Sequence, residues 1–284
     1  MKKGIRTLAL FFCSLFISSC SENSPILNVD VLVVGGGTSG VAAGLQSARS
    51  GVNTLIVEET SWLGGMLTSA GVSAVDGNYN LPAGIWGEFQ SRLIAYYGSR
   101  DSLKTGWVSN VLFEPSVGNQ VFCEMVNQEK NLNVYFDTVW KNIERENNCW
   151  KVTLLRPDGT TEIVVSKVLI DATELGDVAK SCGVGYDIGM ESRDLTNESI
   201  APDNANGIIQ DLTYVAILKD YGVDVTIPEP KGYSPTEFAC ACANQLCKSP
   251  KEPDRIWSKD KMITYGKLPN NKYMINWPIE GNDY

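Results

Sequence analysis

Apolar residues follow two different patterns in the part of the chain that begins near residue 28. Val29–Val34 and Val52–Val57 are short runs rich in β-branched and aliphatic residues, which is typical of strands buried on both faces. The apolar residues between these runs recur with helical spacing and end at a glycine: Val41, Ala42, Leu45, Ala48 and then Gly51. The order of strand, helix and strand predicts a βαβ unit of an α/β fold.

A glycine-rich turn, Gly35-x-Gly37-x-x-Gly40, joins the first predicted strand to the helix. In such a unit Gly35 permits the tight turn, Gly37 lets the backbone approach a pyrophosphate, and Gly40 lets the helix pack closely on the sheet. The helix N-terminus, which includes Ser39, offers unpaired N–H groups to an anion. Glu58 ends the second strand, 23 residues after Gly35, where its carboxylate can accept ribose hydroxyls and repel a 2′-phosphate. The pattern therefore predicts a dinucleotide site that disfavours NADP.

The segment after Glu58 favours FAD over NAD. It carries Gly64-Gly65 and Gly71 with polar Thr68 and Ser69 between them, a composition that suits backbone lying along an extended cofactor. In an NAD dehydrogenase the second strand commonly leads directly into another crossover helix, so an NAD(P)-linked dehydrogenase is the alternative. We expect the stretch 62–114 to be rich in loops.

Three short strand-like runs follow, Asn133–Trp140, Cys149–Leu155 and Thr161–Val165, with the turn Pro157-Asp158-Gly159 between the last two. They predict a small β meander inserted in the dinucleotide-binding domain. The run after them, Lys167–Lys180, reads KVLIDATELGDVAK and contains an Asp-Ala-Thr block at the end of a further strand.

The βαβ unit, the Gly64-Gly65 loop and the Asp-Ala-Thr block resemble the FAD-binding module of flavoproteins with two dinucleotide-binding domains. The resemblance is to the bacterial FAD-dependent oxidoreductase family related to the FAD subunit of heterodisulfide reductase. Looser matches lie in Glu114–Val126, Tyr186–Asp194, Ile200–Tyr214 and Ile275–Tyr284. The resemblance implies an α/β, glutathione-reductase-like Rossmann-type FAD-binding domain with an inserted β meander, and a second, mixed α+β substrate or cap segment. It places Val139 near the adenine and Ala172 beside the cofactor.

These observations divide the chain into four parts. Residues 1–19 are expected to be a signal peptide, 20–27 a linker after a lipidated cysteine, 28–185 the FAD-binding domain with its β meander, and 186–284 a partial substrate or cap segment. Members of the family return to the first domain for a last strand and helix, but no further glycine-rich strand-to-helix turn follows Thr173. We therefore expect a C-terminally truncated chain, with a compact variant as the alternative.

The resemblance implies an FAD-dependent oxidoreductase. Its reaction would be a two-electron, hydride-transferring oxidation or reduction of a small molecule, with carbohydrate-derived compounds among the candidates. Oxygen, a quinone or a protein partner would accept the electrons, and no catalytic residue can be named. Two alternatives are an inactive or truncated fragment of such a flavoprotein and a non-enzymatic, glycan-binding surface lipoprotein.

The N-terminus has the composition of an export signal. Lys2, Lys3 and Arg6 precede the apolar stretch Leu8–Ser19, which is too short to span a bilayer. Ile17-Ser18-Ser19-Cys20 resembles the lipobox of bacterial lipoproteins, in which Cys20 carries the acyl chains; an ordinary signal peptide is the alternative. The sequence thus predicts an exported lipoprotein anchored by lipid at the outer membrane or the periplasmic face of a membrane.

Composition removes several function classes. The net charge of −9 makes nucleic acid an improbable partner, and the absence of histidine excludes Ser-His-Asp and Cys-His mechanisms within this chain. Cys240-x-Cys242-x4-Cys247 is the one cluster with ligand-like residues, and relatives of heterodisulfide reductase carry iron-sulfur clusters. Its spacing matches neither a ferredoxin run nor a paired zinc site, so we predict no metal there and expect free or disulfide-bonded cysteines.

Overall fold

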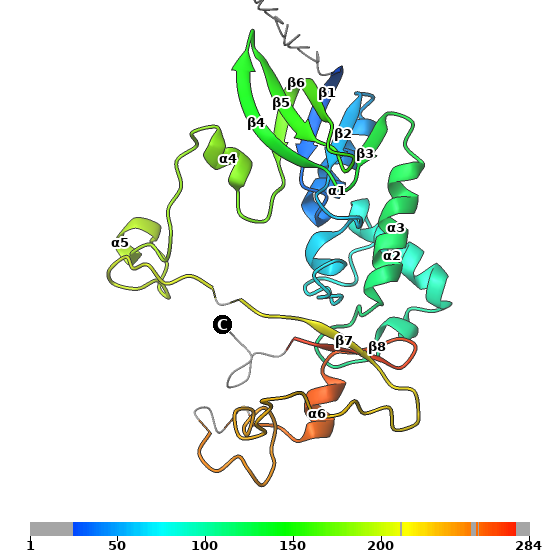
Figure 1. Ribbon diagram of the computed structural model, residues 1–284, viewed down its shortest axis with the longest axis vertical. Helices are drawn as coiled ribbons and strands as arrows, with labels where there is room; N and C mark the ends of the chain where they lie inside the picture. Colours follow the sequence, from blue (N-terminus) through cyan, green and yellow to red (C-terminus); the bar gives the residue numbers. More distant parts are fainter. Residues whose placement is uncertain (1–24, 211, 251–253, 255, 277–284) are drawn as a thin grey trace, which may run out of the picture.

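The computed structural model describes residues 25–210, 212–250, 254 and 256–276. Figure 1 shows a larger sheet at the N-terminal end of this region and a smaller sheet near its C-terminal end. The signal peptide and lipidated Cys20 predicted from the sequence lie outside the described residues. No helix within the described ranges is long and apolar enough to cross a membrane.

The larger sheet has six strands in the order β3-β2-β1-β6-β5-β4. The strands are β1 (Ile26–Val34), β2 (Thr54–Val57), β3 (Leu132–Tyr135), β4 (Val139–Glu146), β5 (Cys149–Leu155) and β6 (Thr161–Asp171). Strands β1, β2, β3 and β6 are parallel, whereas β4 and β5 continue the sheet antiparallel from β6. The prediction of an α/β, Rossmann-type domain with a β meander is therefore confirmed.

Strand β1 is buried on both faces because its side chains alternate between two cores. Val31 and Val33 join the core under α1 (Thr38–Arg49) and α3 (Pro115–Asn127). Leu32 and Val34 join the opposite core, which includes side chains of the meander and of the short helix α4 (Asp177–Ser181). This two-sided burial explains the continuous apolar run in the sequence.

The predicted strand boundaries in the meander are wrong in two places. Asn133–Trp140 is not one strand, because Asp137 adopts a left-handed backbone conformation (φ 50°) and separates β3 from β4. Strand β3 joins the parallel part of the sheet, and only β4 belongs to the meander. Conversely, the run predicted to end at Val165 continues without interruption to Asp171, so that β6 serves both parts.

The stretch predicted to be rich in loops contains a helix, α2 (Gly84–Tyr97), followed by the short η2 (Asp101–Leu103). Phe89 and Leu93 are four residues apart and buried on the same side of α2. The Phe89 ring stacks on Phe122 of α3, with ring centroids 4.3 Å apart. The helical spacing of these apolar residues therefore indicates a helix, which the prediction of a loop-rich stretch did not include.

The C-terminal part forms a small sheet in the order β7-β9-β8. Its elements are β7 (Ala216–Lys219), β8 (Lys267–Leu268), β9 (Lys272–Ile275) and the helix α6 (Lys259–Thr264). Leu268 and Met274 pack with Leu112 in a third core cluster, which joins this sheet to the first part of the chain. After residue 186, the described residues outside this small sheet are mostly loop.

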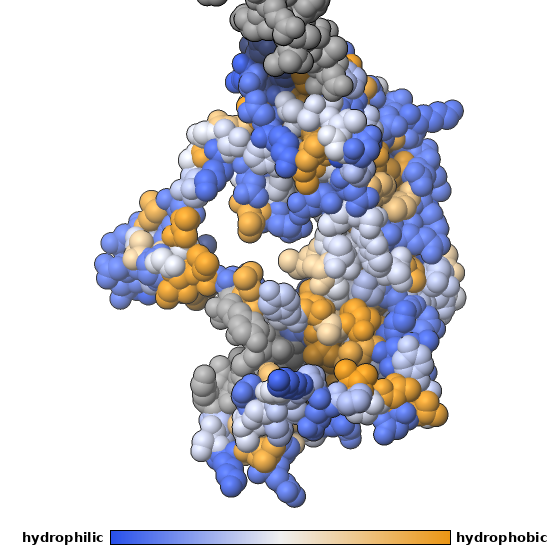
Figure 2. All heavy atoms as spheres, viewed as in Figure 1, coloured by the Kyte–Doolittle hydropathy of each residue, from blue (hydrophilic) through white to orange (hydrophobic). Residues whose placement is uncertain are grey.

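An arm of residues 184–210, which includes the one-turn helix α5 (Arg193–Thr196), stands away from both sheets (Figure 1). Apolar side chains gather on its surface, as Figure 2 shows on the left of the molecule. Leu195 is 71% exposed and Ile200 is 91% exposed. The three buried core clusters include no residue of this arm.

Candidate cofactor site

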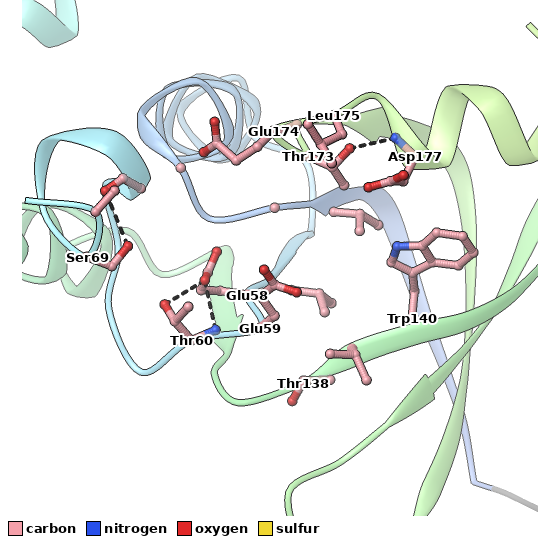
Figure 3. Close-up of a pocket in the computed structure, with 18 of the residues that line it drawn as sticks. Glu58, Glu59, Thr60, Ser69, Thr138, Trp140, Thr173, Glu174, Leu175 and Asp177 are labelled. Carbon is pink, nitrogen blue, oxygen red and sulfur yellow. Dashed lines mark hydrogen bonds between the residues drawn. The ribbon is translucent and has the colours of Figure 1, made fainter. Parts of the chain in front are cut away.

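A cavity of about 450 Å³ opens where β1, β2 and β6 end, beside the start of β4 (Figure 3). The carboxyl ends of parallel strands are the usual ligand position in α/β sheets, and the volume falls in the range of small-molecule sites. The residues that line it are Val34, Gly35, Gly37, Val57, Glu58, Glu59, Thr60, Gly65, Met66, Ser69, Ala70, Thr138, Val139, Trp140, Ala172, Thr173, Glu174, Leu175 and Asp177.

The turn between β1 and α1 has no space for side chains at Gly35 and Gly36. Gly35 has a φ of 103°, and a Cβ atom there would overlap the carbonyl group of Ala172 on the neighbouring strand end. A Cβ at Gly36 would lie 2.8 Å from Cβ of Glu58. Gly37 is the N-cap of α1, and its carbonyl accepts the first helical bond from the N–H of Val41 at 2.9 Å. Backbone alone therefore forms this wall of the cavity.

Glu58 is 7% exposed and holds the glycine turn through hydrogen bonds. Its Oε2 accepts from the N–H of Gly36 at 2.6 Å, and its Oε1 accepts from both the N–H and the hydroxyl of Thr60, at 2.8 and 2.6 Å. A carboxylate has about four acceptor positions, so about one is left for a ribose hydroxyl. Glu58 thus lies at the predicted ribose position, but it also has a structural role that its place in the sequence did not reveal.

The two glycines of the second loop have different surroundings. Gly64 donates its N–H to the carbonyl of Gly36 at 2.8 Å, and its own carbonyl accepts from the hydroxyl of Thr38 at 2.9 Å. A Cβ at Gly64 would meet the Phe122 ring at 2.7 Å, so this glycine lies under the cavity wall. Gly65 is the one that lines the cavity.

Two residues predicted at the pyrophosphate lie outside the cavity lining. Ser39 is exposed in the first turn of α1, and Gly40 packs tightly against the Gly35 carbonyl. Gly40 therefore permits the helix to approach the sheet, as predicted. The structure brings together in the lining the other predicted residues Gly35, Gly37, Glu58, Gly65, Val139 and Ala172.

The Asp-Ala-Thr block forms the opposite wall. Asp171 accepts through Oδ1 from the N–H and hydroxyl of Thr173, at 2.9 and 2.7 Å, and through Oδ2 from the N–H of Ala179 at 2.7 Å. The Thr173 hydroxyl in turn accepts from the N–H of Asp177 at 3.0 Å. Asp171 therefore fixes the loop after β6 and the beginning of α4, which keeps Ala172 at the cavity.

Glu174 is the largest departure from what the sequence predicted. Its Oε1 lies 3.1 Å from the position of a Cβ on Gly37 and 2.8 Å from that of a Cβ on Gly65. The carboxylate therefore lies against the backbone where a pyrophosphate was expected, and Figure 3 shows it directed toward α1 and Ser69. Glu174 directly follows the Asp-Ala-Thr block, which indicates in the sequence that it lies near the cofactor site. Only the folded loop shows that its carboxylate is directed toward Gly37 and Gly65.

The model of the family described as FAD dependent oxidoreductase matches residues 30–284, which is most of the chain. The chain belongs to this family. A search of curated proteins found no match.

Several solved structures are similar to this chain at low sequence identity. A flavoprotein/dehydrogenase from Cytophaga hutchinsonii is 18% identical over 57% of this chain and 44% of its own, with a TM-score of 0.44. A p-nitrophenol 4-monooxygenase from Pseudomonas putida is 16% identical over 58% of this chain and 46% of its own, with a TM-score of 0.43. The chain thus matches less than half the length of each structure.

The residues around the cavity can accommodate the diphosphate and a ribose of the FAD of this family. Gly35, Gly37 and Gly65 line the cavity at the N-terminus of α1 without adding a side chain to it, as a diphosphate there would require, and Glu58 keeps one acceptor position for a ribose. The charge is less favourable. Glu58, Glu59, Glu174 and Asp177 line the cavity, and no Lys or Arg is among the lining residues that the structure describes. Attraction for phosphate therefore comes from backbone N–H groups and the helix dipole.

The predicted cysteine cluster contains a disulfide between Cys240 and Cys247, while Cys242 is a free thiol. Cysteines were predicted to be free or disulfide-bonded there, and both states occur. Over the described ranges, no group of three or more His, Cys, Asp or Glu residues could hold a metal ion.

Proposed function

We propose that this chain binds FAD in the cavity at the ends of β1, β2 and β6 and serves a two-electron oxidation or reduction of a small molecule. Family membership supports the cofactor and the class of reaction. The observation that carries the proposal is the wall of backbone at Gly35, Gly37 and Gly65, where a diphosphate can lie without meeting a side chain other than Glu174.

The residues of the chain would bind and orient the cofactor. The N-terminus of α1 faces the diphosphate, Glu58 holds a ribose hydroxyl, and Asp171 keeps the Ala172–Thr173 wall in place. FAD, when bound, supplies the ring that accepts or donates a hydride. The substrate would be a small molecule. The final electron acceptor would be oxygen, a quinone or a protein.

The proposal is tested by titrating the purified chain with FAD and comparing two glycine substitutions. Gly37 has extended backbone with a φ of −61°, which any residue can adopt, so Gly37→Ala adds a methyl group to the cavity without backbone strain. Gly207→Ala is the matched control, because a Cβ there meets nothing within 4 Å. We expect Gly37→Ala to weaken FAD binding at least tenfold and Gly207→Ala to leave it unchanged.

Two results would count against the proposal. Folded chain that binds no FAD in calorimetry would refute it, and so would equal FAD affinity in Gly37→Ala and the unaltered chain. NAD titrated in parallel tests the dehydrogenase alternative, which predicts that NAD binds and FAD does not.

We also propose that the chain is exported and anchored by acyl chains on Cys20. The support is the basic, apolar and small-residue order of residues 2–20. Cells fed a labelled fatty acid should label the unaltered chain and not Cys20→Ser. Equal labelling of both, or none of either, contradicts the proposal.

A further inference from the structure

Trp140 is a cavity residue that the glycine and acidic motifs do not explain. It is the second residue of β4, and its indole is half-buried beside the core cluster that contains Val34 and Val57. Figure 3 shows it at the end of the cavity opposite Ser69. An aromatic ring therefore closes one end of the proposed FAD site.

A β-bulge accompanies this placement. Val139 pairs with Leu155 and Trp140 with Leu154, but the next pair is Asn142 with Thr153, so the register shifts directly after Trp140. Val139 and Trp140 both line the cavity, and they come directly before the extra residue of the bulge, Lys141. Bulges bend a strand and redirect side chains near functional sites.

The order of groups along the cavity identifies what meets the indole. Gly37 and Gly65 lie at the diphosphate position, and Glu58 lies at the ribose position at the end of β2. Thr138 follows, its N–H donating to the Glu58 carbonyl at 3.0 Å, and Trp140 lies two residues beyond it, in β4. In a dinucleotide the group beyond that ribose is the adenine.

We propose, resting on the proposed function, that the indole of Trp140 stacks on the adenine ring of FAD and supplies a main part of the affinity. The cavity is lined by carboxylates and lacks basic side chains in the described lining, so its charges cannot provide the attraction. A flat, half-buried indole held by its packing can stack on a flat base irrespective of charge. Stacking of this kind changes affinity by about 5- to 150-fold when the aromatic residue is replaced by alanine.

The test uses ADP as well as FAD, because ADP carries the adenine and diphosphate without the flavin, which would quench tryptophans at long range. We expect ADP to quench tryptophan fluorescence in the unaltered chain and not in Trp140→Phe. We expect Trp140→Ala to weaken both FAD and ADP at least fivefold, and Trp140→Phe to restore most of the affinity. Trp150→Ala on the adjacent strand is the control, because Trp150 is outside the cavity lining and contacts Arg145 at 5.3 Å.

Unchanged FAD and ADP affinities in Trp140→Ala would overturn this inference alone. An equal loss in Trp150→Ala would also overturn it, because the loss would then reflect the meander as a whole. No binding of FAD or ADP to the unaltered, folded chain would overturn the proposed function together with the inference.

Discussion

Replacing Glu174 by glutamine should strengthen FAD binding, which is the reverse of the usual effect of changing a cavity residue. The Glu174 carboxylate lies about 3 Å from the positions that side chains on Gly37 and Gly65 would occupy, in the space proposed for the diphosphate. A carboxylate and a phosphate charge 4 Å apart repel by about 4 kcal/mol at an effective dielectric constant of 20. Glu174 is exposed and can turn away, so the net effect will be smaller, about 1–2 kcal/mol.

This magnitude corresponds to a five- to thirtyfold lower Kd for FAD in Glu174→Gln. Calorimetric titration at low and high salt provides the assay. Salt should strengthen FAD binding to the unaltered chain, because it screens the acidic lining, and should do so less in Glu174→Gln. Glu191→Gln is the control with the same change of charge, since Glu191 lies outside the lining. Equal or weaker FAD binding in Glu174→Gln would refute the assignment of the diphosphate to this place.

Two further predictions concern carboxylates that hold elements of the fold together. Burial raises the pKa of Glu114, but hydrogen bonds from Lys272 and Asn270 and the charge of Lys272 outweigh it, so that the pKa lies below its usual value. The free energy of unfolding should therefore fall as the pH falls below about 4.5, and urea titrations from pH 7 to 3 should show a smaller fall in Glu114→Gln. The second carboxylate is Asp171. In Asp171→Asn one oxygen becomes an amide nitrogen that cannot accept, so the bond from the Ala179 N–H or one from Thr173 is lost. We expect the free energy of unfolding to fall by about 1–3 kcal/mol and FAD binding to weaken. Unchanged melting temperature and FAD affinity in Asp171→Asn would contradict the role of this carboxylate.

The parts of the site that the sequence predicted are those built by neighbours in the chain. The turn from Gly35 to Gly40 and the acidic end of β2 follow from local order, because a buried parallel strand must turn tightly into its helix. Ala172 was identified by the Asp-Ala-Thr block. Each of these features depends on few residues, so each could be read from a short stretch.

The parts that were missed depend on contacts between distant segments. Glu174 reaches Gly37 and Gly65 only because β6 ends beside β1, and Glu58 has Gly36 as a partner only in the folded turn. Trp140 lies at the cavity only because β4 begins beside the end of β2, where the N–H of Thr138 donates to the Glu58 carbonyl. Helix α2 was a different omission, since the spacing of Phe89 and Leu93 was visible in the sequence.

The split of Asn133–Trp140 shows why strand boundaries were less predictable than strands. Apolar and β-branched residues continue across the break, and only the left-handed backbone at Asp137 ends β3. Asp and Asn accept this conformation more readily than most residues, but they do not require it. The pairing of β3 with β2 therefore decides the boundary.

The most direct test of the central claim is the absorbance spectrum of the purified chain, mixed with excess FAD and passed through a desalting column. The account predicts that the chain retains flavin bands near about 370 and 450 nm in stoichiometric amount, as expected of a bound isoalloxazine, and that Gly37→Ala, still folded by circular dichroism, retains little. A folded, colourless chain, or equal flavin retention in both proteins, would contradict the claim that this cavity holds FAD.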